Sequence, residues 1–470
     1  MRIALAIVAL GVVTASSAVA QSDDGGSPKP WPGYTPQFFR WNEDYRTLTG
    51  QAADLPYPLR LKYLPLDDSG QSYVSLGGEY RFRVDTYGRP DFGLHNAPGF
   101  TSLQDRFLVH ADTHISPDFR VFVQLGYELE NGRLPVRRPF DQSQPDVAQA
   151  FADVNLGVPG NTWRLRVGRQ EVSLGRYIAV RDGVNIRRTF DGVKLDGTVT
   201  DWTITGLAAH ATRNRPRAFD DDPDPNDKIA LIQAEHPLPI DNFKFDLVSF
   251  QRDNRIAVYA PGTGNEVRRT VSARIAGNRD GWDLDAQASF QSGTFAPLGG
   301  PTFDIRAVGA AFEGGRTLAL PWSPRLAIRI DAAGGGMDKA GHRLNTFDLP
   351  YPNLTYLTDA SIFAPRNVRD IQPFISVTPM RTLTLTAGAE FLWRVSANDA
   401  VFSAANTPII GPGGHGDYVA SEPYFRVDWQ INPLVEWAGA IVYAVPGEVL
   451  RSFGGTRPLT LAYTSLTLRF

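Results

Sequence analysis

The chain has 470 residues, of which 47 are basic and 50 acidic, and none is cysteine. The lack of cysteine excludes a disulfide framework and a catalytic thiolate, and the near balance of charge gives no electrostatic footprint for nucleic acid. Beyond residue 20 there is no apolar run of the roughly eighteen residues that a transmembrane helix needs.

Residues 1–20 have the pattern of a secretory signal peptide. Arg2 precedes an apolar run over residues 3–13, and the small residues Ala18, Val19 and Ala20 precede Gln21. The run is too short to cross a bilayer as a helix. We therefore expect export and cleavage near Ala20.

The chain from residue 72 onward alternates between apolar and polar residues. Within residues 73–87, Leu76 and Phe82 stand at even positions, and Arg81 and Arg83 stand at odd positions. A period of two predicts a strand with one apolar and one polar face. About eighteen such segments are present, each long enough to cross a bilayer as a tilted strand. They begin near residues 72, 101, 119, 147, 162, 188, 201, 226, 243, 264, 281, 304, 323, 367, 382, 418, 434 and 459.

The connections between these segments alternate in length. Tight turns are expected at 115–118, 277–281, 378–381 and 432–433. Long connections are expected at 88–100, 131–146, 171–187, 332–366 and 395–417. This alternation predicts an all-β fold: one antiparallel β-barrel in the outer membrane of a Gram-negative cell, with short periplasmic turns and long outer loops. A soluble sandwich or propeller would also have many short strands, but it fits the strand lengths and the even strand number less well.

The two ends of the barrel domain, residues 72–470, are expected on the periplasmic side because the strand number is even. The last strand ends at Phe470, a terminus expected of barrels inserted by the barrel-assembly machinery. That machinery, outer-membrane lipids and lipopolysaccharide are the expected partners, and no cofactor is expected. Residues 21–71 are expected to lie along the periplasmic rim or to enter the lumen.

Several separated motifs resemble the alginate-export family of outer-membrane barrels. They are RWNEDY at 40–45, LKYLPL at 61–66, YVSLGGEYR at 73–81, GRQE at 168–171, RRTFDGV at 187–193, Phe347 and Asp348 through Tyr351 and Pro352, and Asn367. The resemblance covers nearly the whole mature chain and implies an eighteen-stranded barrel.

The resemblance also implies transport, with one departure. Alginate-secreting members of the family can carry a long periplasmic loop near the last strands, which plugs the pore. Here the turn after Ile431 is only Asn432 and Pro433. This difference favours a passive channel for smaller acidic or neutral solutes, in which the long loop 332–366 could fold inward as a constriction.

Arginines are concentrated between the fifth and sixth expected strands. Only six of the basic residues in the chain are lysine, yet residues 168–197 hold Arg169, Arg176, Arg181, Arg187 and Arg188. Strand parity places further arginines on the lumen face, namely Arg81, Arg83, Arg106, Arg164, Arg166, Arg268, Arg274, Arg329 and Arg426. The planar guanidinium binds carboxylates in a bidentate manner and keeps its charge, so these residues predict a constriction for acidic sugars or other small anions.

A structural role for the same arginines is the alternative. Lumen positions also carry acids such as Glu79, Asp85 and Asp153, so the arginines could pair across strands and stiffen the wall. For Arg187 and Arg188, an ion pair with Asp191 is the leading structural alternative. The open functional alternatives are a general or neutral-solute porin and a blocked structural or adhesive barrel. No histidine lies beside a nucleophile motif, and Asp283 and Asp285 share one strand face, so an enzyme is not expected.

Two clusters raise the question of a metal ion. His110 and His114 share a strand face but lie about 13 Å apart, so they cannot hold one ion. The acidic loop from Asp220 to Asp227 could bind calcium or bridge to lipopolysaccharide. A solvated loop is the more common explanation, and no metal is expected.

Overall fold

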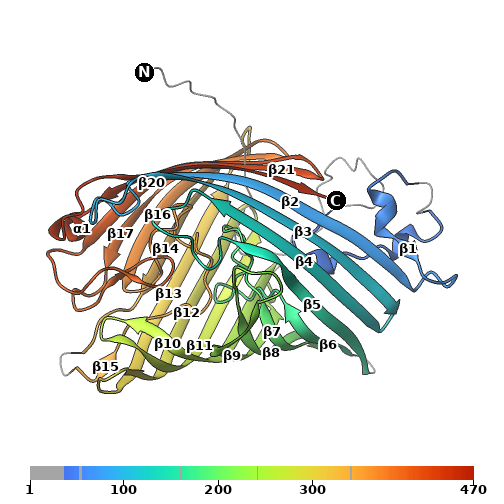
Figure 1. Ribbon diagram of the computed structural model, residues 1–470, viewed down its shortest axis with the longest axis horizontal. Helices are drawn as coiled ribbons and strands as arrows, with labels where there is room; N and C mark the ends of the chain where they lie inside the picture. Colours follow the sequence, from blue (N-terminus) through green and yellow to red (C-terminus); the bar gives the residue numbers. More distant parts are fainter. Residues whose placement is uncertain (1–35, 52–54, 159–160, 241, 339–340) are drawn as a thin grey trace.

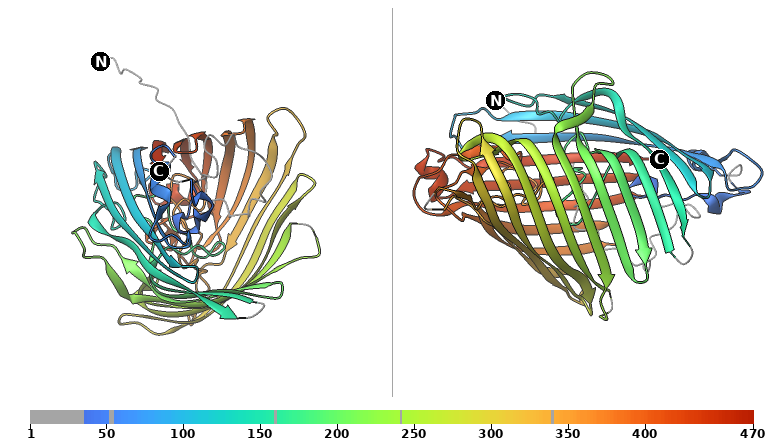
Figure 2. Two further views of the ribbon diagram at one scale, coloured as in Figure 1. Left: turned by 90° about the vertical axis from the view of Figure 1, so that its right-hand side faces the viewer. Right: turned by 90° about the horizontal axis from the view of Figure 1, so that it is seen from below.

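The computed structural model describes residues 36–51, 55–158, 161–240, 242–338 and 341–470, so the expected signal peptide lies outside the described residues. A single antiparallel β-sheet closes on itself, because β22 pairs with β2 along Glu79–Gly88 and Thr460–Arg469. Figures 1 and 2 show the resulting barrel of tilted strands. Its eighteen wall strands are β2 (Tyr73–Gly88), β3 (Phe100–Ser116), β4 (Phe119–Asn131), β5 (Ser143–Val158), β6 (Asn161–Gln170), β7 (Phe190–Val199), β8 (Trp202–Arg213), β9 (Asp222–Pro237), β10 (Phe243–Tyr259), β11 (Gly262–Arg279), β12 (Trp282–Pro297), β13 (Phe303–Thr317), β14 (Arg325–Ala333), β16 (Val368–Met380), β17 (Leu383–Arg394), β20 (Tyr418–Asn432), β21 (Val435–Pro446) and β22 (Leu459–Arg469).

The smaller elements are not among the eighteen wall strands. They are η1 (Arg40–Asn42), η2 (Arg46–Leu48), η4 (Leu59–Lys62), β1 (Leu64–Pro65), β15 (Arg343–Leu344), β18 (Val401–Phe402), β19 (Pro408–Ile410) and α1 (Glu448–Ser452). Among the described residues, no helix has the length and apolar character needed to cross a membrane.

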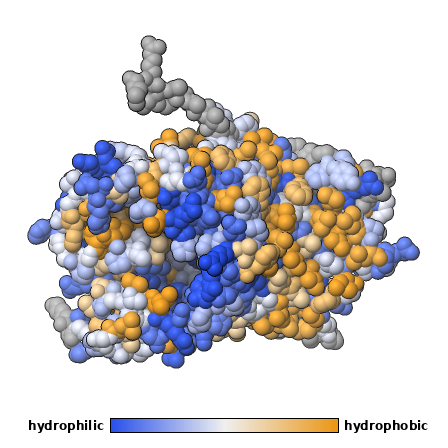
Figure 3. All heavy atoms as spheres, viewed as in Figure 1, coloured by the Kyte–Doolittle hydropathy of each residue, from blue (hydrophilic) through white to orange (hydrophobic). Residues whose placement is uncertain are grey.

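The expected period of two is confirmed along the wall. On β3, Arg106 is 1% exposed, whereas the next residue, Phe107, is 42% exposed and Val109 is 52% exposed. Apolar side chains thus face outward and polar ones face inward, as a barrel in a lipid bilayer requires. Figure 3 shows apolar side chains gathered over the outside of β3 to β5.

Short turns and long loops occupy opposite ends of the barrel. β20 ends at Asn432 and β21 begins at Val435, and this tight turn lies at the same end as the C-terminus (Figure 1). The long loops and α1 lie at the other end. The alternation predicted from the sequence is therefore confirmed for most connections, with an exception at the long-loop end, where β10 ends at Tyr259 and β11 begins at Gly262.

Two of the long loops fold into the barrel and pair with each other. Ala179 N–H donates to the carbonyl of Tyr351 at 2.9 Å, and Tyr351 N–H donates to the carbonyl of Tyr177 at 3.1 Å. A third loop joins them, because Ala364 N–H donates to the carbonyl of Phe402 at 3.0 Å. Figure 2 shows these loops inside the ring of strands. The inward fold considered for residues 332–366 is thus present.

The described part of the N-terminal segment meets the inner face at the short-turn end. Trp41 is 7% exposed and packs edge-on against Phe122 and Phe151, at ring distances of 6.3 and 6.2 Å. Arg40 Nη2 donates to the backbone oxygen of Phe470 at 2.8 Å. The segment therefore contacts the seam where β22 closes on β2.

Candidate solute-binding site

Residues 171–189, the connection between β6 and β7, are fixed to the barrel wall by several side chains, of which Asn185 makes the most hydrogen bonds to wall and loop carbonyls. The Asn185 side-chain nitrogen lies 3.1 Å from the carbonyl oxygen of Asp105, 2.8 Å from that of Leu129 and 3.0 Å from that of Asp141. Asn185 itself is fully buried. This contact with β3, β4 and the following connection explains why the segment, here called the arginine loop, lies inside the barrel.

Arg187 of this loop contacts two acidic residues of the loop and one aromatic residue of the N-terminal segment. Its Nη2 lies 3.2 Å from Glu171 Oε2, and its Nε lies 3.4 Å from Asp182 Oδ1. The guanidinium also lies over the ring of Phe38, 4.4 Å from the ring centre. The N-terminal segment and the arginine loop therefore meet inside the barrel.

Two wall arginines extend this network. Arg106 Nη2 pairs with Glu79 Oε1 at 2.6 Å and with Asp182 Oδ1 at 2.8 Å. Arg81 instead donates to two backbone carbonyls of the loop, those of Asp182 at 2.6 Å and Val184 at 2.5 Å. The loop is thus held by charge as well as by Asn185.

Two other arginines of the loop have no carboxylate partner. Arg188 donates to the carbonyls of Ala179 and Pro352, both at 3.2 Å, and lies over the ring of Tyr351. Arg181 donates to the carbonyl of Ile186 and to Asn214 Oδ1, both at 3.3 Å. Within the described part of the chain, neither has a carboxylate oxygen within 4.0 Å. Their charges are therefore available to an anion that reaches them.

The environment of the loop shifts the pKa values of its charged groups. Burial raises the pKa of Glu171 to about 7, although Arg187 opposes the shift. Burial also opposes ionisation of Asp182, but Arg106, Arg187 and Arg81 outweigh it and lower the pKa of Asp182 to about 2. Burial lowers the pKa of Arg188 to about 10, so Arg188 stays charged at neutral pH. Among these groups, Glu171 is the one that titrates near neutrality.

Asp191 does not pair with Arg187 or Arg188, the structural alternative considered from the sequence. Its Oδ1 accepts a hydrogen bond from Arg169 Nε at 2.9 Å, whereas Arg187 pairs with Glu171 and Asp182 as described above. Arg169 and Asp191 are direct partners in the β6–β7 ladder. The structural alternative, an ion pair of Asp191 with Arg187 or Arg188, is therefore not the arrangement observed, because the strand register places Arg169 opposite Asp191.

The remaining arginines of the expected set lie on wall strands, and Arg274 shares its partner Asp285 with Arg176 of the arginine loop. Each has a carboxylate partner on its own or a nearby segment. The pairs are Arg83 with Asp85, Arg164 with Asp196, Arg166 with Asp153, Arg268 with Glu266, Arg274 with Asp246 and Asp285, Arg329 with Asp331, and Arg426 with Asp359 and Asp428. Only Arg81, Arg106, Arg181, Arg187 and Arg188 form or adjoin the network around Asp182 and Val184 described above.

The space beside Arg187 is small. A cavity of about 20 Å³ is bordered by Glu171, Ile186 and Arg187 of the loop and by Glu128 and Asp146 of the wall. A single water needs roughly 10–15 Å³. A sugar ring therefore cannot enter this cavity unless the loop or its side chains move.

Two buried glutamates lie side by side in the structure, which the sequence alone does not predict. Glu390 and Glu422 are cross-strand partners on β17 and β20, and both are fully buried. Thr358 from the long inward loop donates to Glu422, and neither carboxylate oxygen of Glu390 has a hydrogen-bond partner. Only the strand register, which the sequence does not reveal, brings these two residues together.

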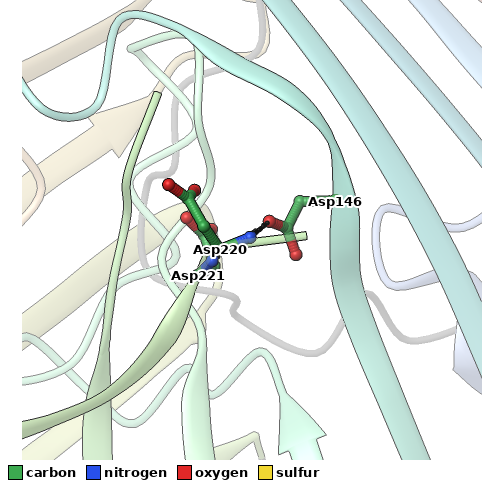
Figure 4. Close-up of side chains that lie close together, drawn as sticks. All are labelled: Asp146, Asp220 and Asp221. Carbon is green, nitrogen blue, oxygen red and sulfur yellow. Dashed lines mark hydrogen bonds between the residues drawn. The ribbon is translucent and has the colours of Figure 1, made fainter. Parts of the chain in front are cut away.

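The acidic loop divides into two groups. Asp222 pairs with Arg213 and Arg215, and Asp227 pairs with Arg252. Asp220 and Asp221 instead donate their backbone N–H groups to Asp146 of β5, and Figure 4 shows the three residues side by side. His110 and His114 do not join any group of three metal-ligating side chains among the described residues.

Comparison with known proteins identifies the family. The family model described as "Alginate export" matches residues 72–458. The chain belongs to the alginate export family. No curated protein matches the sequence.

Solved structures with the same fold are outer-membrane channels of low sequence similarity to this family member. OccK5 (OpdH) of Pseudomonas aeruginosa is 12% identical, with a TM-score of 0.53 and coverage of 84% of this chain and 98% of that chain. OccAB4 of Acinetobacter baumannii is 10% identical, with a TM-score of 0.56 and coverage of 85% and 98%. OccK2 (OpdF) of P. aeruginosa in complex with glucuronate is 13% identical, with a TM-score of 0.54 and coverage of 84% and 98%.

The family and the barrel fold together point to an outer-membrane channel. A channel of this kind lies among outer-membrane lipids and lipopolysaccharide and passes solutes, and it is not a class of enzyme. The predicted fold class, family and membrane are confirmed.

Proposed function

We propose that this protein is a diffusion channel for acidic oligosaccharides or polysaccharides, or for other small anionic solutes. Arg187 and its neighbours in the arginine loop form the constriction. The observation that carries the proposal is a set of guanidinium groups without a carboxylate partner among the described residues, the buried Arg81 and the half-buried Arg181 and Arg188, beside the partly satisfied Arg187. Positive charge in a low-dielectric wall attracts counter-charged solutes.

Transport in this channel needs weak and replaceable contacts. Each backbone carbonyl or carboxylate that now holds a guanidinium can be exchanged for a solute carboxylate, which the planar guanidinium binds in the same way. Binding at several such positions lets the solute move from one to the next. The fold shared with OccK2, whose structure holds glucuronate, is consistent with a uronate as solute.

The narrow space beside Arg187 favours a solute smaller than a polysaccharide chain, unless the loop is displaced. It also keeps a competing function open. If the arginine loop and the loop 334–367 stay packed together, the barrel conducts nothing and acts as a structural or adhesive protein. A neutral-solute porin is the other competitor.

Targeting and assembly complete the proposal. The signal peptide, residues 1–20, directs export and is removed near Ala20. Residues 21–71 form a pre-barrel segment and residues 72–470 form the barrel. The last strand, ending at Phe470, is the segment that the barrel-assembly machinery engages.

Titration of single-channel current with uronate oligomers tests the solute class. We expect concentration-dependent block of the refolded mature protein, and weaker block by neutral glucose oligomers of the same length. Replacing Arg187 with alanine removes a charge-assisted contact of about 1.5 kcal/mol and should weaken uronate block about tenfold. Equal block by both oligomers would support a neutral-solute porin, and no conductance at all would support the blocked barrel.

A further inference from the structure

Three aspartates from two elements converge beside the arginine loop. Asp146 lies near the start of β5, and Asp220 and Asp221 immediately precede β9. Each offers one carboxylate oxygen within 4.8 Å of the others (Figure 4). The N–H groups of Asp220 and Asp221 donate to Asp146 Oδ2 at 2.8 and 3.1 Å, which fixes the connection between β8 and β9 against the wall.

A fourth carboxylate borders the same cavity from a different strand, although its oxygens are not among the three aspartate oxygens that lie within 4.8 Å of one another. Glu128 of β4 is 4% exposed. Its Oε1 lies over Gly126, at 2.6 Å from the position that a Cβ there would take, and Gly126 is the cross-strand partner of Asp146. Glu128 also borders the cavity that Asp146 and Asp221 line. Within the described residues it accepts no hydrogen bond and has no basic group within 4.0 Å.

The negative charge of this group is poorly compensated. The nearest paired cation is Arg169, whose Nη1 is 3.9 Å from Asp146 Oδ1 and whose Nε is bonded to Asp191. One oxygen of Asp220 is buried and has no hydrogen-bond partner. Neutral donors satisfy the oxygens of Asp146 and Asp221, namely the N–H groups of Val147 and Arg215 and the amide of Asn214, but they do not cancel the negative charge. Bringing several carboxylates together away from water is costly unless a cation joins them.

We propose that Asp146, Asp220, Asp221 and Glu128 form a binding site for a divalent cation, with Ca²⁺ as the best match. Ca²⁺ accepts six to eight oxygen ligands in irregular geometry at about 2.3–2.6 Å. Ligand oxygens around one such ion lie at most about 5 Å apart, which agrees with the spacing of the three aspartates. The ion ties the β8–β9 connection to β4 and β5 beside Arg187.

Calcium titration of the refolded full-length mature barrel tests the site. The protein is refolded in detergent without lipopolysaccharide, so that lipid phosphates cannot supply the signal, and is then freed of metal by chelation. Calorimetry should show one saturable Ca²⁺ site, with a dissociation constant in the range of about 0.1–1 mM that exposed protein sites often have. Absence of saturable binding would overturn the proposal.

Variants assign the binding to these residues. Glu128→Gln and Asp146→Asn should each weaken Ca²⁺ binding at least about tenfold, because each removes a ligand charge. Asp222→Asn is the matched control, since Asp222 lies next to the cluster but pairs with Arg213 and Arg215. Glu128 makes no hydrogen bond with any residue that the structure describes, so Glu128→Gln tests the site even if Asp146→Asn does not fold. Unchanged affinity in Glu128→Gln would contradict the proposed ligand set.

Discussion

Arg187 lies 3.2 Å from Glu171 inside the barrel, and the side chains of both residues are nearly fully buried. Glu171 thus occupies the position that a solute carboxylate would take on the guanidinium. Because burial raises the pKa of Glu171 to about 7, this internal competitor loses its charge just below neutral pH. The charge that Arg187 presents to a solute therefore depends on pH.

Lowering the pH from 8 to 6 should increase anion selectivity. Protonation of Glu171 leaves Arg187 with Asp182 as its remaining acidic partner, while Arg106 stays paired with Glu79. Reversal potentials measured at both pH values check this. The Glu171→Gln variant should have the same anion selectivity at pH 8 and pH 6, equal to that of the wild type at pH 6. If its selectivity changed with pH as in the wild type, the titrating group would be a residue other than Glu171.

The same titration affects stability. The pKa of Glu171 is higher in the folded protein than its ordinary value of 4.5, so the folded state binds the proton more tightly than the unfolded state. Its contribution to stability is complete below pH of about 4.5 and is lost as the pH rises through about 7. Urea unfolding should therefore show that Glu171→Gln stabilises the protein at pH 8 relative to wild type, and much less at pH 5.

Arg187→Ala should shift selectivity toward cations. The variant leaves the carboxylates of Glu171 and Asp182 without this guanidinium, so the chloride-to-potassium permeability ratio should fall at least about twofold. Arg279→Ala is the matched control, because Arg279 is exposed at the short-turn end of β11 and pairs with exposed Asp280. If both variants changed the permeability ratio equally, the cause would be the overall charge of the protein and not the charge at the constriction.

Asn185→Ala should release the arginine loop. The change removes the side chain that contacts three carbonyls, and each buried group left without a partner costs about 1–3 kcal/mol. We expect larger, noisier single-channel currents and faster proteolysis within residues 171–189. Asn278→Ala, at an exposed position on β11, should leave both unchanged. Wild-type conductance and protease resistance in Asn185→Ala would show that other contacts hold the loop.

Phe470→Ala should reduce assembly in cells more than folding in detergent. The backbone of Phe470 pairs with Gly78 in both directions at 3.1 Å, and alanine keeps that pairing. Refolding into detergent should remain close to wild type, while the amount in the outer membrane should fall. Equal loss in both assays would mean that the ring matters for the barrel itself.

The wall of the barrel could be predicted from the sequence because each strand separates lipid from the interior. Arg106 and Phe107, adjacent in sequence, face opposite sides, and this alternation is visible in the sequence itself. The start of β9 was harder to predict. It begins at Asp222 and not near 226, and it includes Pro223, which lacks an N–H and argues against a strand. Pro223 is tolerated because it lies opposite Thr212, beyond a register shift after His210.

The site could be predicted only in outline. The arginines of the loop form a cluster that can be recognised in the sequence. Their partners, however, depend on which residues pair between neighbouring strands and on contacts across the barrel. Asp191 is assigned to Arg169 by a register that one sequence does not specify. Asn185 has no local signal, because its carbonyl partners lie 44 to 80 residues away. Glu128 and Asp146 likewise meet Asp220 and Asp221 only after the barrel closes.

We expect the arginine loop to make this channel selective for anions over cations. The most direct test is the reversal potential of the refolded mature protein in a planar bilayer under a potassium chloride gradient at neutral pH. We expect a conducting pore whose reversal potential has the sign that preferential chloride permeation gives. A cation-selective potential, or a barrel that does not conduct, would contradict it.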